Sequence, residues 1–141
     1  DGADQTIGLP TYETSGEAGA DLRANFPDGQ TVTLDAGARA LIPTGLSMAI
    51  PNGFEVQIRP RSGLALKHGI SMVNAPGTID SDYRGSVGVI LINHADAPFD
   101  VTHGMRIAQM VMAPVIQAEF EVVGALDETD RGAAGFGSTG V

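Results

Sequence analysis

The chain has 141 residues and no cysteine. Disulfide bonds, thiolate metal ligands and a cysteine nucleophile are therefore excluded. The absence agrees with a reducing compartment, and we expect a cytoplasmic protein. A chain of this length fits one domain, and it can bury a hydrophobic core without covalent cross-links.

Long apolar runs are also lacking. The longest extends from Val87 to Ile92 and is interrupted by Gly88, whereas a bilayer-spanning helix needs roughly 20 apolar residues. No signal-peptide pattern opens the sequence, so we expect no membrane association. The first residue is Asp1 rather than methionine, which leaves room for residues upstream.

Basic residues are scarce, with 8 Lys and Arg against 17 Asp and Glu and a formal net charge of −9. Such an acidic surface repels the phosphate backbone of nucleic acid, so we expect no nucleic-acid partner. A small phosphate ligand is still possible, because a local cluster of cations can outweigh a distant field. All the cations except Lys67 are arginines, whose planar guanidinium matches phosphate oxygens.

Glycine and proline are plentiful, with 19 and 8 residues, and they separate short apolar or alternating segments. These segments predict strands at Val32–Leu34, Ala40–Ile50, Phe54–Ile58, Val87–Asn93, Arg106–Val115 and Phe120–Val123. Only Ser62–His68 is typical of a helix, with Ser62 as a candidate N-cap and Gly69 as its end. We therefore predict an all-β domain, a sandwich, barrel or jelly roll, with one short helix.

The C-terminal residues from Gly132 to Gly140 are almost all small and surround a single Phe136. From composition alone, they are typical of a frayed tail. Together with Arg131, they also resemble a phosphate-binding loop, although the lysine of a P-loop is missing. We predict a single core domain over residues 1–130 and a flexible C-terminal arm over residues 131–141.

Two segments carry candidate catalytic carboxylates. Asp21 lies among apolar residues where a strand is expected, so it is either a solvent-facing strand residue or a carboxylate near a metal ion or its water. Asp80 and Asp82 follow Gly77 and share one face if their strand is regular. They form either an acidic turn or a pair of which one acts as a base.

Two further segments carry candidate anion contacts. Arg61 and Ser62 stand at the start of the expected helix, whose free N–H groups attract anions, although an ordinary capped helix explains them equally well. In the strand expected after Gly104, Arg106 and Gln109 should lie on opposite faces. Gln109 is costly to bury among apolar residues without a partner, and a cross-strand hydrogen bond is one way to supply it.

These five segments occur in the order and spacing of the five motifs of the dUTPase family, and the sequence resembles a homotrimeric dUTPase. The resemblance extends from Leu9 to Gly140, and its most specific parts are Pro60-Arg-Ser-Gly-Leu-Ala and Gly77-Thr-Ile-Asp-Ser-Asp-Tyr-Arg-Gly. It implies a jelly-roll-like fold and a homotrimer in which the C-terminal arm of one chain closes over a pocket formed by the other two. The chain departs from many members only at the Ala133-Ala134 pair in the arm.

The resemblance implies a dUTP diphosphatase that uses Mg²⁺ to hydrolyse dUTP to dUMP and pyrophosphate. Such an enzyme supplies dUMP for dTMP synthesis and keeps uracil out of DNA. Two alternatives remain. One is a dCTP deaminase-like enzyme of the same fold, for which Glu55 is the candidate water-activating acid, and the other is a nucleotide-sensing protein without activity.

The resemblance also assigns roles to individual residues. Asp80 activates the attacking water, and Asp21 holds a water on a Mg²⁺ ion that is bound mainly by the substrate phosphates. Phosphate or neighbouring-subunit contacts are implied for Arg61, Ser62, Gly63, Arg106 and Gln109. Uracil and deoxyribose contacts are implied for Asn74, Gly77, Ile79 and Tyr83. The closing arm contributes Arg131, Phe136, Gly137 and Ser138, with Phe136 stacked on uracil.

Overall fold

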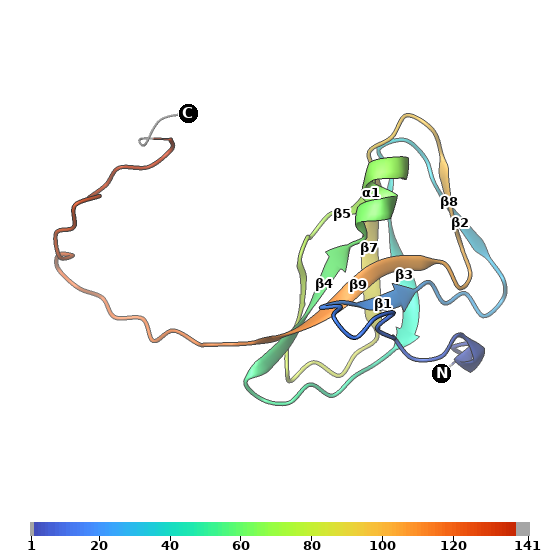
Figure 1. Cartoon of the computed structure of the whole chain (residues 1–141), viewed down its shortest axis with the longest axis horizontal. Helices are drawn as coiled ribbons and strands as arrows, with labels where there is room; N and C mark the ends of the chain where they lie inside the picture. Colours follow the sequence, from blue (N-terminus) through green and yellow to red (C-terminus); the bar gives the residue numbers. More distant parts are fainter. Residues whose placement is uncertain (1, 138–141) are drawn as a thin grey trace.

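A computed structural model describes residues 2–137 of the chain (Figure 1). Strands dominate this part, and only two short helical elements interrupt them. In chain order the elements are η1 (Gln5–Ile7), β1 (Ala20–Arg23), β2 (Thr31–Leu34), β3 (Arg39–Leu46), β4 (Phe54–Pro60), α1 (Ser62–His68), β5 (Ile70–Met72), β6 (Gly77–Ile79), β7 (Val87–Asn93), β8 (Phe99–Thr102) and β9 (Arg106–Pro114). No helix in residues 2–137 is long and apolar enough to cross a membrane.

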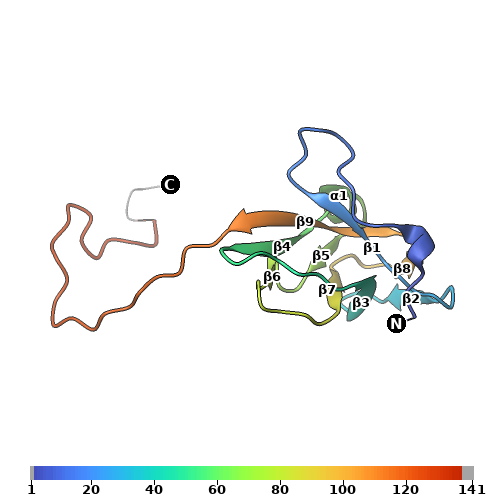
Figure 2. The ribbon, with the colours of Figure 1, turned by 90° about the horizontal axis from the view of Figure 1, so that it is seen from below.

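The strands form a four-stranded sheet in the order β1-β9-β4-β6, a three-stranded sheet in the order β3-β7-β5, and the pair β2-β8. All of their pairings are antiparallel. The hydrophobic core joins buried side chains from all three sheets, and Figure 2 shows β9 and β4 on one side of the body with β3 and β7 on the other. The predicted mostly-β fold with one short helix is confirmed.

Alternation of apolar and polar residues produces the core-facing strands. In β4, Val56 and Ile58 are buried while Glu55 and Gln57 are only half-buried, as expected for a strand with one face on the core. β7 extends from Val87 to Asn93, as predicted, and its residues alternate between buried and half-buried. The period of two therefore identifies the buried face of both strands.

The short helix has the predicted residues but not the predicted cap. Arg61 occupies the N-cap position in an extended conformation and makes no side-chain cap, so Ser62 is the first helical residue. The expectation that Ser62 caps the helix is wrong, because β4 ends at Pro60 and Arg61 is the residue between the strand and the helix. Gly69 ends the helix as predicted, with the positive φ of 65° that glycine adopts at little cost.

β3 is shorter than the predicted Ala40–Ile50. Its pairing with β7 shifts between Pro43 and Leu46, and Gly45 has a φ of 71°. A side chain at Gly45 would overlap the Asn25 amide, so glycine is needed there for both its φ and its small size. This irregularity turns the chain off the ladder, and the strand ends at Leu46.

The segment that follows β9 leaves the body of the molecule (Figure 1). Val115 N–H donates to the Gly53 carbonyl at 2.9 Å. Beyond it, residues 116–137 contain no strand, so the predicted strand Phe120–Val123 is wrong. A strand requires a neighbour to accept and donate its ladder hydrogen bonds, and this segment extends away from the sheets of its own chain (Figure 2).

Candidate active site

Asp21 on β1 is a buried carboxylate surrounded by hydrogen-bond donors. Its Oδ1 lies 3.3 Å from Arg61 Nε and 3.4 Å from Gln109 Nε2, and its Oδ2 lies 3.1 Å from Arg106 Nη1. Only 6% of Asp21 is exposed, and a buried carboxylate is costly unless it is paired and hydrogen-bonded. The alternative of a solvent-facing strand residue is therefore wrong. We call these four residues the Asp21 cluster.

A β-bulge in β9 brings Arg106 and Gln109 to the same carboxylate. The pairing of β1 with β9 is regular from Ala20 to Leu22, which lies opposite Ala108. Arg23 then lies opposite Arg106, so Ile107 is an extra residue on β9. Without the bulge, Arg106 and Gln109 would lie on opposite faces, as the sequence predicted. That expectation is wrong. A cross-strand hydrogen bond, the partner that the sequence offered for Gln109, is present: Gln109 Nε2 donates to Asp21 Oδ1 at 3.4 Å.

The Asp21 cluster lies beside the start of α1. Arg61 Nη1 donates to the Arg106 carbonyl at 3.1 Å, which ties the residue before the helix to β9. Ser62 and Gly63 follow in the first helical turn and are exposed. Three predicted phosphate contacts, Arg61, Arg106 and Gln109, are therefore in contact with Asp21. Ser62 and Gly63 directly follow Arg61 along the chain.

Asp80 directly follows β6, which is the other edge of the four-stranded sheet. Its carbonyl accepts a hydrogen bond from Tyr83 N–H at 3.2 Å, so residues 80–83 form a turn. The expectation that Asp80 and Asp82 share a strand face is wrong, because the strand ends at Ile79. The carboxylate of Asp80 is nevertheless on an exposed residue, as a base that must reach a substrate-bound water requires.

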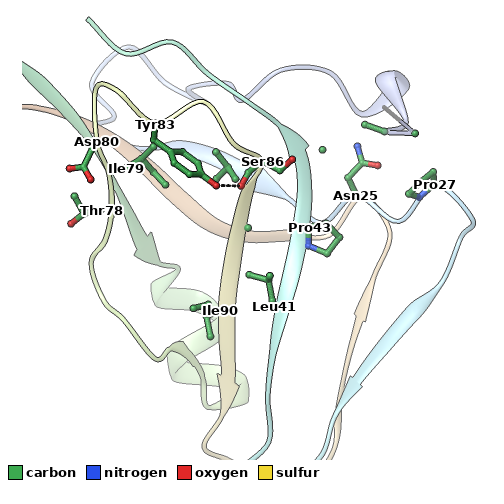
Figure 3. Close-up of a pocket in the computed structure, with 15 residues that line it drawn as sticks. Asn25, Pro27, Leu41, Pro43, Thr78, Ile79, Asp80, Tyr83, Ser86 and Ile90 are labelled. Atoms are coloured by element: carbon green, nitrogen blue, oxygen red, sulfur yellow. Dashed lines mark hydrogen bonds between the residues drawn. The ribbon is translucent and has the colours of Figure 1, made fainter. Parts of the chain in front are cut away.

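Two cavities meet at Asp80. The larger, of about 660 Å³, is mainly polar and is lined by Glu55, Asp82 and Gln117 among others. The other, of about 610 Å³, is mainly apolar and includes Leu41, Pro43, Ile79, Tyr83, Val87 and Ile90 (Figure 3). Both volumes fall in the range that accommodates a small-molecule ligand.

The Tyr83 ring is held against the chain that follows it. Its hydroxyl donates to the Ser86 carbonyl at 3.0 Å (Figure 3). A Cβ at Gly85 would overlap atoms of the ring, so this close approach requires glycine. The half-exposed ring is thus fixed three residues from Asp80.

Residues 74–79 connect the two larger sheets and lead into the Asp80 turn. Asn74 packs against Gly77, since a Cβ at Gly77 would lie 3.3 Å from Asn74 Nδ2. Ile79 pairs with Val56 at the end of β6 and lines the apolar cavity. The predicted uracil and deoxyribose contacts therefore lie on the same stretch of chain as Asp80.

The fold separates the predicted site residues into two groups. β1 and β6 are opposite edges of one sheet, so Asp21 and Asp80 are separated by three inter-strand spacings, about 14 Å across the sheet. They are also offset along it, because Asp21 aligns through Gln109 with Arg59 of β4, whereas β6 ends with Ile79 opposite Val56. Arg131, Phe136 and Gly137 are exposed on the segment that leaves the body, and Ser138 lies outside the described residues. One chain thus brings the anion-binding candidates together but does not bring them to Asp80.

Arg84 has no role in the sequence-based prediction, yet it contacts the turn that carries Asp80. Its Nη1 donates to the carbonyls of Ser81 and Tyr83. The only available signal in the sequence is its position next to Tyr83, which does not reveal whether an arginine faces solvent, an acid or the backbone.

The acidic side chains in the described residues fit a metal ion that is coordinated mainly by the phosphates of a bound molecule and by water, rather than by the protein. No group of three or more His, Cys, Asp or Glu suited to a metal occurs in residues 2–137. Mg²⁺ keeps several waters and is usually bound through one or two carboxylates together with substrate phosphates. A single carboxylate with nearby cations, as at Asp21, agrees with contact through a water and does not provide a protein-only cage.

Comparisons with known proteins agree on one family. Residues 5–140 match the family model described as dUTPase. The deoxyuridine 5′-triphosphate nucleotidohydrolase of Roseobacter denitrificans is 73% identical over 140 residues, which are 99% of this chain and 91% of that protein. The protein of the same name from Rhizobium rhizogenes is 61% identical over 96% of this chain and 86% of its own length.

Among solved structures, the dUTPase of Staphylococcus bacteriophage 80alpha with dUPNHPP has a TM-score of 0.86 at 25% identity. The match covers 98% of this chain and 95% of that chain. The sequence and structural likenesses therefore extend over both groups of candidate site residues.

Proposed function

The chain belongs to the dUTPase family and is a dUTP nucleotidohydrolase, and from this premise we propose how its residues divide the reaction. The observation that carries the proposal is the position of Asp80, an exposed carboxylate where two cavities meet. The deaminase alternative has less support, because Glu55 Oε1 accepts a hydrogen bond from Gln57 Nε2 at 2.7 Å and the relatives are named as nucleotidohydrolases. A purely sensing role is not needed to account for these residues.

Asp80 acts as the general base. It accepts a proton from a water about 3 Å away, and the water oxygen forms a bond to the α-phosphorus while the bond to the pyrophosphate oxygen breaks. The products are dUMP and pyrophosphate. No ion pair involves Asp80 within residues 2–137, so its carboxylate is available to the water.

The Asp21 cluster and the start of α1 bind the triphosphate. Arg61, Arg106 and Gln109, with Ser62 and Gly63, offer donors to the phosphate oxygens on which charge develops. A bound Mg²⁺ would neutralise phosphate charge and fix the conformation of the triphosphate. Asp21 is the residue that would hold one of its waters, and it orients both arginines.

The segment from Asn74 to Tyr83 selects the nucleotide. Backbone groups around Gly77 and Ile79 read uracil together with Asn74, and the Tyr83 ring packs under deoxyribose. The missing Cβ at Gly77 lets Asn74 lie close beside this backbone, since a Cβ there would be 3.3 Å from Asn74 Nδ2. A methyl group in a soft apolar pocket changes binding by only about 1–3 kcal/mol, so rejection of thymine relies on contact between C5 and a stiff backbone.

The complete site forms in a homotrimer with a jelly-roll-like subunit. The separation of Asp21 and Asp80 by three strand spacings supports this assembly, because one chain does not bring both to the same substrate. The core over residues 1–130 supplies two groups from two subunits, and the arm over residues 131–141 of a third closes the site. In this arm Arg131, Gly137 and Ser138 contact phosphate, and Phe136 stacks on uracil.

Pyrophosphate release on adding dUTP and Mg²⁺ to the purified chain tests the proposal. We expect Asp80→Asn to lower kcat by about 10²–10⁴-fold while dUTP still binds, because the amide cannot accept the proton. Asp82→Asn, two residues away in the same turn, is the matched control and should retain activity. Normal turnover by Asp80→Asn would exclude Asp80 as the base.

In the cell, the reaction supplies dUMP for dTMP synthesis and keeps uracil out of DNA, and we place the enzyme in the cytoplasm.

A further inference from the structure

The turn that carries Asp80 and Tyr83 is held by the side chain of Arg84. Arg84 Nη1 donates to the Ser81 carbonyl at 2.7 Å and to the Tyr83 carbonyl at 2.8 Å. Hydrogen bonds from an ionised donor are shorter and stronger than those between neutral groups. One guanidinium nitrogen therefore ties together two carbonyls on either side of residue 82.

The turn has little other support from the backbone. Tyr83 N–H donates to the Asp80 carbonyl at 3.2 Å, and β6 ends at Ile79, before the turn begins. Asp80, Asp82, Tyr83 and Arg84 are all exposed, so core packing does not fix them. The side-chain contacts of Arg84 and Tyr83 are consequently the main restraints on this part of the chain.

Arg84 uses its donors on the backbone although two carboxylates are close in sequence. Within residues 2–137 no ion pair joins Arg84 to Asp80, Asp82 or another acid. An exposed ion pair would contribute only about 0–1 kcal/mol and would restrict the backbone little. Contacts with two carbonyls instead fix the orientation of two peptide groups.

We propose that Arg84 is a positioning residue for the reaction. By holding the Ser81 and Tyr83 carbonyls, it sets the direction of the Asp80 carboxylate and the placement of the Tyr83 ring. The inference rests on the roles proposed above for Asp80 and Tyr83. Because a displacement of about 1 Å can lower a rate by roughly 10²-fold, a loosened turn affects catalysis even though Arg84 does not contact the substrate.

Kinetics of three variants test the proposal. Arg84→Ala removes both contacts, Arg84→Lys keeps a cation with three donors, and Arg39→Ala removes an equal charge from an exposed residue of β3 in another sheet. We expect Arg84→Ala to lower kcat for dUTP by about ten- to a hundredfold. It should also lower the ratio of kcat/KM for dUTP to kcat/KM for UTP. Arg84→Lys should recover most of the loss, and Arg39→Ala should match the wild type.

Tyrosine spectra give a readout that a general loss of stability would not reproduce. The chain has 2 tyrosines and no tryptophan, so ring-labelled tyrosine gives separate NMR signals for Tyr12 and Tyr83, assigned with Tyr12→Phe. In Arg84→Ala, the Tyr83 signals should shift while those of Tyr12 stay in place. In Arg84→Lys and Arg39→Ala, both should remain near their wild-type positions.

The possible outcomes separate this inference from the proposed function. Wild-type protein that leaves dUTP intact would contradict the proposed function itself. Active wild type together with Arg84→Ala at an unchanged kcat, or with unchanged Tyr83 signals, would overturn the inference alone. If Arg84→Ala does not fold, Arg84→Met replaces it, because it keeps an unbranched apolar stem but has no hydrogen-bond donor. A wild-type kcat in Arg84→Met with unmoved Tyr83 signals would overturn the inference in the same way.

Discussion

Replacing Asp21 by Asn should destabilise the protein as well as impair catalysis. The substitution removes the negative charge that pairs with Arg61 and Arg106. The asparagine amide has nearly the same size as the carboxylate, so the packing around it is kept. Breaking a fully buried ion pair costs about 3–5 kcal/mol. The side chains of Arg61 and Arg106 are 25% and 40% exposed, so both can turn toward water, and we expect a smaller loss of about 1–3 kcal/mol.

Unfolding in urea, followed by circular dichroism at fixed protein concentration, measures this loss. The concentration must be fixed because association of subunits shifts apparent stability. Asp28→Asn is the matched control, since Asp28 is exposed in a turn and has no ion pair within residues 2–137. A double-mutant cycle with Arg61→Gln should give a coupling free energy of about 0.5–3 kcal/mol. Stability of Asp21→Asn equal to that of the control would refute the reasoning.

Two further predictions concern the arm and the Tyr83 ring. Deletion of residues 131–141 should strongly lower kcat for dUTP while sedimentation still shows a trimer, and full activity of the truncated chain would exclude a closing arm. Gly85→Ala should lower kcat/KM for dUTP, because its Cβ would displace the Tyr83 ring, whereas Gly124→Ala, with no atom nearby, should not. An active Gly85→Ala enzyme with unchanged Tyr83 signals would contradict the required close approach.

Local patterns in the sequence predict much of the fold. Val56 and Ile58 alternate with polar residues and face the core, and Ser62–His68 is a helix ended by Gly69. These features depend on neighbouring residues only, since the period of two and the glycine at a positive φ act locally. The strands β5, β6 and β8 have only three or four residues, so an apolar period is barely visible in them, although β2 of similar length is predicted as Val32–Leu34.

Features that depend on distant partners could not be predicted in the same way. The bulge at Ile107 appears in the sequence only as two adjacent apolar residues between Arg106 and Gln109, and its effect depends on the pairing with β1. The predicted strand Phe120–Val123 has the composition of a strand, but no other segment within residues 2–137 pairs with it. Likewise, spacing along the chain does not reveal that Asp21 and Asp80 lie on opposite edges of one sheet.

Mixing two inactive variants tests most directly the claim that each site combines residues from different subunits. Asp80→Asn and Arg106→Ala are prepared separately, unfolded and refolded together in equal amounts, and assayed for pyrophosphate release. In a cyclic trimer with shared sites, each site takes Asp80 from one subunit and Arg106 from another, and each residue is intact in half of the subunits. About a quarter of the sites in the mixture therefore have both residues intact, so we predict about a quarter of wild-type activity. A mixture no more active than its separate components would contradict shared sites.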